Sequence, residues 1–218
     1  MLTPYLARQL PLDPLSIYQC LRGEPEARAV AEPFTAHVLA CVISIGLLES
    51  IENRSCLGRA IGLTRGEMAA LARDWLPGAR DCVDISTLPD TASFDDEEEQ
   101  LRQLLRTHQA GSGSEAQWLV SMIARRSMSA NHLWQDLGLW SRADLNRLMA
   151  ERFPGLASRN TSNMKWKKFF YRMLCEMEGF TLCTAPTCRE CNDFDNCFGE
   201  ETGESALARI RRGSTPDV

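Results

Sequence analysis

The spacing of apolar and polar residues predicts a chain built mainly from helices. In the stretch 164–177, "MKWKKFFYRMLCEM", apolar residues recur every three or four positions and so line one face of a helix. The apolar face consists of Trp166, Phe169, Phe170, Met173, Leu174 and Met177. A second stretch, "EPFTAHVLACVISIGLLESI", is apolar on nearly all sides, which is typical of a core helix. Patterns typical of strands are scarce, so the expected fold class is all-α.

Capping residues indicate where several of these helices begin. Thr64 is followed three residues later by Glu67, which is the pattern of a capping box. The acids at 95–99 open another helical pattern, where the positive end of the helix dipole favours negative charge. Ser114 opens the next pattern, "SEAQWLVSMIARRSM", and is expected to cap it.

The chain also contains an internal similarity. Residues 64–79, "TRGEMAALARDWLPGA", align without gaps with residues 141–156, "SRADLNRLMAERFPGL". Just upstream, "LGRAIGL" resembles "LWQDLGL". Two interpretations are open: a duplicated helical unit, or two capped amphipathic helices that resemble each other because both end in Pro-Gly.

Composition narrows the class of protein. The 218 residues carry a formal net charge of −5, so a general nucleic-acid binder is not expected. The longest apolar run, "VLACVISIGLL", has 11 residues and is too short to span a bilayer. The first residues, "MLTPYLARQLPLDPL", lack the apolar stretch of a signal peptide. We therefore expect a cytoplasmic protein with neither nucleic-acid nor membrane partners.

Four of the nine cysteines are clustered near the end of the chain, with the spacing C-x4-C-x2-C-x5-C. They are Cys183, Cys188, Cys191 and Cys197. Cytoplasmic thiols stay reduced, so clustered cysteines indicate a metal rather than disulfides. Thiolates select zinc or iron–sulfur clusters. Structural zinc usually takes two short cysteine pairs, and this pattern has only one, so the spacing favours a cluster and leaves zinc as an alternative.

These patterns divide the chain into three parts. Residues 1–178 are expected to form the helical domain, including the similar units 64–79 and 141–156. Residues 179–200 form a C-terminal cysteine-rich metal-binding loop, and residues 201–218 form a C-terminal tail.

The stretch "HLWQDLGLWSRADLNRLMAERFPGLASRNTSNMKWKKFFYRMLCEMEG", followed by the four-cysteine spacing and "FG", resembles the NifQ family of nitrogen-fixation proteins. The similarity is dense over residues 132–199. It implies an iron–sulfur protein that carries molybdenum in a Mo-Fe-S cluster, held by the four cysteines. It further implies that the protein donates this molybdenum for assembly of the nitrogenase iron–molybdenum cofactor, with the NifEN scaffold and the nitrogenase iron protein as partners. The expected role is that of a carrier and not of an enzyme.

Other residues near the cysteines have two interpretations each. Cys175 is either an auxiliary ligand or a small apolar residue on the flank of its helix. His132 is either an auxiliary ligand or a hydrogen-bonded structural residue. A group of cations precedes the cysteines, either as a solvated face or as a surface that attracts molybdate or an acidic partner. It comprises Lys165, Lys167, Lys168 and Arg172.

Two alternative functions fit parts of the pattern. Helical DNA glycosylases with a [4Fe–4S] cluster share the C-x2-C-x5-C end of the spacing, but their first spacing is longer and they need a larger basic surface. The third hypothesis is a helical interaction module stapled by zinc.

Overall fold

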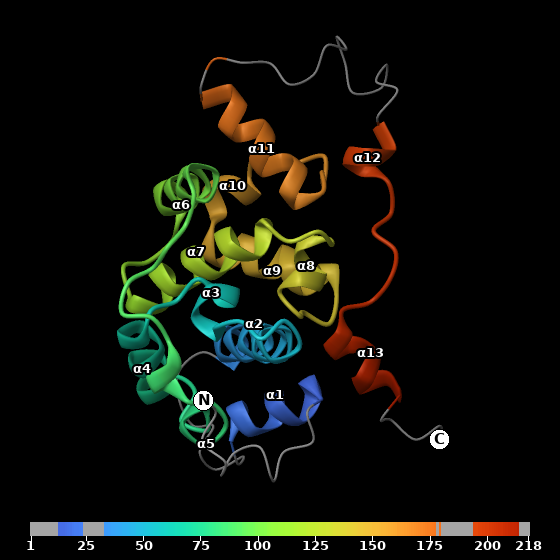
Figure 1. The fold of residues 1–218 in the computed structure, drawn as a ribbon. Helices are drawn as coiled ribbons and strands as arrows, with labels where there is room; N and C mark the ends of the chain where they lie inside the picture. The colour runs from blue at the N-terminus through green and yellow to red at the C-terminus, as the bar shows by residue number, and fades with distance from the viewer. Residues whose placement is uncertain (1–12, 24–32, 178, 180–193, 214–218) are drawn as a thin grey trace.

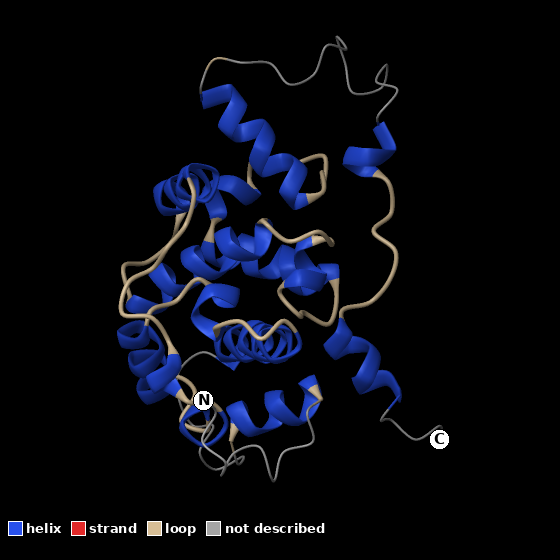
Figure 2. Cartoon of the chain, in the orientation of Figure 1, coloured by secondary structure: helices blue, strands red, loops and turns tan. Residues whose placement is uncertain are grey.

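The computed structural model describes residues 13–23, 33–177, 179 and 194–213. Within these ranges all regular secondary structure is helical and no strand occurs, so the all-α prediction is confirmed (Figure 2). The elements follow in this order: α1 (Pro14–Arg22), α2 (Pro33–Glu52), α3 (Leu57–Ile61), α4 (Arg65–Asp74), α5 (Ala79–Cys82), η3 (Ile85–Thr87), α6 (Asp96–His108), α7 (Ser114–Ser127), α8 (Leu133–Asp136), α9 (Arg142–Arg152), α10 (Pro154–Ala157), α11 (Trp166–Met177), α12 (Phe194–Phe198) and α13 (Ala206–Gly213).

The apolar helix α2 lies in the middle of the molecule and packs against α1, α3 and α13 (Figure 1). Its residues from Phe34 to Gly46 are all buried, as its uniformly apolar sequence predicts. Among the described residues it is also the one helix long and apolar enough to cross a membrane, by length and composition. Its most apolar window is 78% buried inside the molecule, which is what a core helix requires.

Helix capping follows the sequence at two of three predicted sites. Thr64 and Glu67 form the capping box of α4, and the Asp95 carboxylate accepts a hydrogen bond of 2.9 Å from the Glu98 N–H at the start of α6. The prediction for Ser114 is wrong: Ser114 is the first helical residue of α7, and Gly113 occupies the N-cap without a side-chain cap. Gly113 has an extended backbone that any residue can adopt, so the N-cap of α7 lies one residue before the predicted one.

The two similar sequence units fold alike. Each runs from a short helix through a capped helix to a second short helix, α3–α4–α5 in one case and α8–α9–α10 in the other. The short helix in each unit is followed by a glycine with positive φ, 75° at Gly62 and 68° at Gly138. Ser141 and Asp144 repeat the capping box of Thr64 and Glu67. Duplication as the origin of this match stays a hypothesis.

The apolar face of α11 is shorter than the pattern predicts. Trp166, Phe169, Phe170 and Met173 are buried, and Leu174 is half-buried. Met177, the last residue of the helix, is 59% exposed, so its assignment to the buried face is wrong. The face is buried where α11 begins, because there it packs on the body, and it is exposed where the helix ends.

One buried arginine, Arg126, joins α7 to α2 and α8. Arg126 on α7 is 2% exposed and donates to both oxygens of Glu49 at 2.6 Å. Its Nε also donates to the Asp136 carbonyl oxygen at 2.7 Å, which fixes the end of α8. A buried guanidinium needs such a complete set of acceptors, because an unpaired charge in the interior is costly.

The chain returns to the body after α12. From α12 it runs along the side of the molecule to α13, which packs against α1 and α2 (Figure 1). Leu207 on α13 is completely buried, and the Arg211 guanidinium lies 3.8 Å from the centre of the Trp140 ring. Part of the expected tail is therefore attached to the helical body, through Leu207 and Arg211.

Candidate functional site

One of the four predicted metal ligands lies within the described residues. Cys197 is in the short helix α12 and is half-buried. Cys183, Cys188 and Cys191 lie outside the described residues. The site is therefore described from the surface that receives α12.

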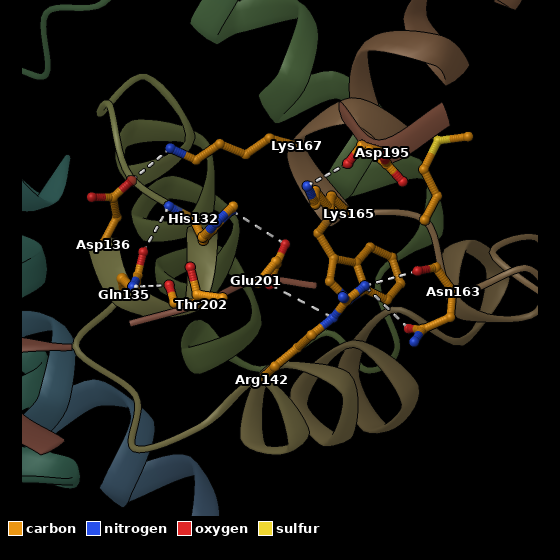
Figure 3. Close-up of polar contacts among 12 residues, drawn as sticks. His132, Gln135, Asp136, Arg142, Asn163, Lys165, Lys167, Asp195, Glu201 and Thr202 are labelled. Atoms are coloured by element: carbon orange, nitrogen blue, oxygen red, sulfur yellow. Dashed lines mark hydrogen bonds and ion pairs between the residues drawn. The ribbon is translucent and has the colours of Figure 1, made fainter. Parts of the chain in front are cut away.

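Lys165 fixes α12 through two hydrogen bonds. Its backbone N–H donates to the Cys197 carbonyl oxygen at 2.8 Å. Its Nζ donates to the Asp195 carbonyl oxygen, also at 2.8 Å (Figure 3). Lys165 directly precedes α11, so both bonds connect α12 to the helix that leads into the cysteine segment. Cys197 and Phe198 also pack against the apolar core. The backbone that bears the Cys197 thiol is thus held in a defined place.

A buried carboxylate holds the chain just after α12. The Glu201 side chain is 5% exposed and lies between Arg142 and His132 (Figure 3). Its oxygens are 3.6 Å from Arg142 Nε and 3.5 Å from His132 Nδ1. Sequence reasoning missed Glu201, because nothing local distinguishes it from the neighbouring acid Glu200.

The next two residues contact α8. Gln135 Nε2 donates to the Thr202 carbonyl oxygen at 3.3 Å. Gly203 has φ +98°, and a Cβ at that position would lie 2.8 Å from Gln135 Nε2. A residue with a side chain would be strained there and would press on Gln135, so glycine permits this close approach.

His132 takes part in this attachment. Its N–H donates to Gln135 Oε1 at 3.1 Å at the start of α8, and its ring faces Glu201. The structure therefore brings His132 to the chain four residues beyond Cys197. A direct role for His132 as a metal ligand stays a prediction.

Lys167 is directed into the body. Its side chain is 17% exposed and forms an ion pair of 2.6 Å with Asp136, whose side chain is 2% exposed (Figure 3). Its Nζ also donates to the Ser129 carbonyl oxygen at 2.5 Å. Burial lowers the pKa of Lys167, and the bond to Asp136 opposes that shift. The predicted basic group is therefore divided, since Lys165 and Lys167 both bind the protein's own chain.

The other two cations of this group lie on the surface. Lys168 is exposed and forms no ion pair within the described part of the chain. Arg172 is also exposed, and its Nε donates to Glu176 at 2.9 Å along the same helix. The predicted attraction of molybdate or of an acidic partner therefore remains a proposal for Lys168 and Arg172.

Cys175 lies near the far end of α11 and is half-buried. It follows Trp166 by nine residues, which is about 14 Å along a helix axis. The structure does not bring Cys175 to Lys165, where the Cys197 backbone is held. Its role as an auxiliary ligand stays a prediction.

Within the described ranges, no group of three or more histidine, cysteine, aspartate and glutamate side chains is arranged to hold a metal ion. The four cysteine thiolates predicted from the sequence suit soft metals. Of these four, Cys197 lies within the described residues.

Together these features define a class: an all-helical protein that fastens both flanks of a C-terminal cysteine-bearing segment to its body. The sequence matches the profile of the NifQ family over residues 38–199. The chain belongs to the NifQ family.

Curated relatives agree with this assignment. The chain is 40% identical over 175 residues to a protein named "Protein NifQ homolog" from Sinorhizobium fredii, covering 79% of this chain and 75% of the relative. It is 37% identical over 179 residues to "Protein NifQ" from Rhodobacter capsulatus, covering 82% of this chain and 97% of the relative. It is 38% identical over 161 residues to "Protein NifQ" from Azotobacter vinelandii, covering 69% and 83%. No solved structure matches the chain.

Proposed function

We propose that this protein carries molybdenum in a Mo-Fe-S cluster bound by Cys183, Cys188, Cys191 and Cys197, and donates it for assembly of the nitrogenase iron–molybdenum cofactor. Membership of the NifQ family indicates a role in nitrogen fixation, and the proposal specifies that role. The observation that carries it is the placement of Cys197, the last cysteine of the spacing, half-buried at a surface where Lys165 fixes its backbone.

The donor set and the placement both fit a cargo that must be released. Thiolates are suitable ligands for iron, molybdenum and sulfide clusters, and four of them within fifteen residues can surround one small cluster. A half-buried ligand on a short helix can be reached by a partner, whereas a ligand in the core cannot. The body beneath has its own apolar core, so it does not depend on the metal for folding.

This role requires molybdate as the source of the metal. It also requires the NifEN scaffold and the nitrogenase iron protein as the partners in cofactor assembly. The proposed role is carriage in the cytoplasm and not catalysis. The exposed cations Lys168 and Arg172, next to the cysteine segment, suit the attraction of an anion or of an acidic surface. Nucleic acid and membrane are not among the proposed partners.

Metal analysis of cysteine variants tests the proposal. The full chain is purified without oxygen, and iron, molybdenum, sulfide and zinc are measured per chain. Replacing Cys183, Cys188, Cys191 or Cys197 by alanine should remove most of the iron and molybdenum while helical circular dichroism persists. Cys56→Ala is the matched control, because Cys56 is also half-buried and lies outside the segment.

The metal content separates the alternatives. Iron with molybdenum supports the proposal, iron without molybdenum indicates a [4Fe–4S] protein, and zinc alone indicates a structural staple. If all four variants kept the full metal content, the ligand assignment would be wrong.

A further inference from the structure

A cavity of about 360 Å³ lies beside α12. One wall is the loop between α10 and α11, with Arg159, Thr161 and Ser162. Phe169 and Met173 of α11 form an apolar wall, and Phe198, which follows Cys197, forms another. The cavity is therefore lined by the residue that follows the fourth cysteine of the predicted cluster site.

The loop is rigid at its base and leaves several donors unused. Asn160 clamps it, because Asn160 Nδ2 donates to the Met164 carbonyl oxygen at 2.9 Å and Met164 N–H donates back to Asn160 Oδ1 at 2.8 Å. Within the described chain, the Arg159 guanidinium and the hydroxyls of Thr161 and Ser162 have no hydrogen-bond or ion-pair partner. The loop thus contributes three exposed side chains to the cavity lining, one of them a cation and two of them hydroxyl donors.

The charge of the cavity is positive but partly cancelled. Two guanidiniums line it, those of Arg159 and Arg172, and one carboxylate, that of Glu176. Arg172 Nε is already bonded to this carboxylate at 2.9 Å, so Arg159 carries the uncompensated charge. A positive mouth with hydroxyl donors suits a small anion that accepts several hydrogen bonds.

We propose that this cavity binds a small tetrahedral oxyanion through Arg159, Thr161 and Ser162, and that this oxyanion is molybdate. The choice of molybdate rests on the proposed function, whereas the binding of an oxyanion rests on the donors alone. A guanidinium binds two oxygens of such an anion at once, and hydroxyls can donate to the others. The anion would then be held directly beside the segment in which the cluster is proposed to lie.

Calorimetric titration of the full-length, metal-free chain with sodium molybdate tests this site. Arg159→Ala should weaken binding about tenfold or more, because it removes a charge-assisted hydrogen-bond donor. Thr161→Val, which keeps the shape, should weaken it a few-fold. Glu176→Gln should tighten binding a few-fold, because it removes the negative charge from the cavity lining and releases Arg172 from its ion pair. Arg73→Ala is the control, because Arg73 is an exposed arginine on α4 that pairs with Asp74. This variant should bind molybdate with the affinity of the wild type.

Competition identifies the ligand class. Displacement of molybdate by sulfate or phosphate supports a tetrahedral oxyanion site, and tighter binding of molybdate than of either supports its assignment to molybdenum. Sulfate or phosphate binding more tightly than molybdate would overturn that assignment. Absence of binding at millimolar molybdate, or equal affinity in the wild type and Arg159→Ala, would overturn the site itself.

The same titration on Cys197→Ala keeps the two proposals separable. Because the metal-free chain is used, Cys197→Ala should still bind the oxyanion. If the chain binds molybdate through Arg159 but never acquires a cluster, only the proposed function fails. If the chain acquires the cluster while Arg159→Ala binds molybdate as tightly as the wild type does, only the proposed oxyanion site is refuted.

Discussion

The ion pair between Lys167 and Asp136 allows a test of which lysines near the cysteine segment are structural. Lys167→Met removes the ammonium and keeps much of the side-chain volume. It leaves the Asp136 carboxylate buried, and among the described residues one side-chain hydrogen bond to it remains, of 3.0 Å from Asn131. We expect this variant to be clearly less stable than the wild type.

The magnitude follows from the geometry. At 2.6 Å and an effective dielectric constant of about 20, the attraction is about 6 kcal/mol. Desolvation of the two ions takes back several kcal/mol of this, so the net value of the pair is small. Losing only one partner of a buried pair typically costs about 3–5 kcal/mol. Because Asn131 still donates and Lys167 is 17% exposed, we expect about 3 kcal/mol.

Urea denaturation followed by circular dichroism, on the metal-free chain, measures this loss. Asp136→Asn should cost a similar amount, because it leaves the ammonium unpaired. The double variant should lose no more than about 1 kcal/mol, so the two changes should be strongly non-additive. Lys168→Met is the matched control next in the chain, and should change stability by about 0.5 kcal/mol or less.

A loss in Lys167→Met no larger than in Lys168→Met would refute the buried pair. Lys167 would then be a surface cation, as the sequence pattern alone suggests. A loss in Lys167→Met that is absent from Lys168→Met would mean that any reduced metal delivery by Lys167→Met reflects stability and not the docking of a partner.

Two further predictions concern the core. Phe170→Ala should destabilise the protein by about 3–5 kcal/mol in urea denaturation, because Phe170 is 1% exposed, whereas Met177→Ala should change stability by no more than about 0.5 kcal/mol. Burial lowers the pKa of His37 to about 4, below its ordinary value of 6.5. The unfolded chain therefore binds the proton first, so stability should fall by about 3 kcal/mol as pH drops from 6.5 towards 4. His37→Gln should flatten that part of the stability profile, and an unchanged slope would show that His37 does not cause it.

Local patterns were enough to predict most of the helical framework. The core helix, the box of Thr64 and Glu67, and the buried start of α11 all depend on residues a few positions apart, so they are visible in sequence. The N-cap of α7 lies one residue earlier than predicted, at Gly113, because no side chain caps this helix and the local capping rule has nothing to detect.

The candidate site depends on distant residues and was predicted less well. Lys167 and Lys168 look equivalent in sequence, and only the first reaches Asp136, which lies 31 residues earlier in the chain. Likewise Glu201 meets Arg142 and His132 only because the chain folds back after α12. One local signal was present: Gln135 follows His132 by three residues, as in a capping box, and both now hold the returning chain.

The attachment on both sides of the cysteine segment has a thermodynamic consequence. Met177 ends α11 and Phe194 begins α12, so sixteen residues lie between two fixed ends. Holding both ends of a free chain of that length in place, and so closing it into a loop, costs on the order of 2.5 kcal/mol in conformational entropy. The contacts of Lys165 and Glu201 supply that closure as part of folding, before any metal is bound. A metal bound between those ends would not have to bear the entropic cost of that closure, because folding of the body has already met it.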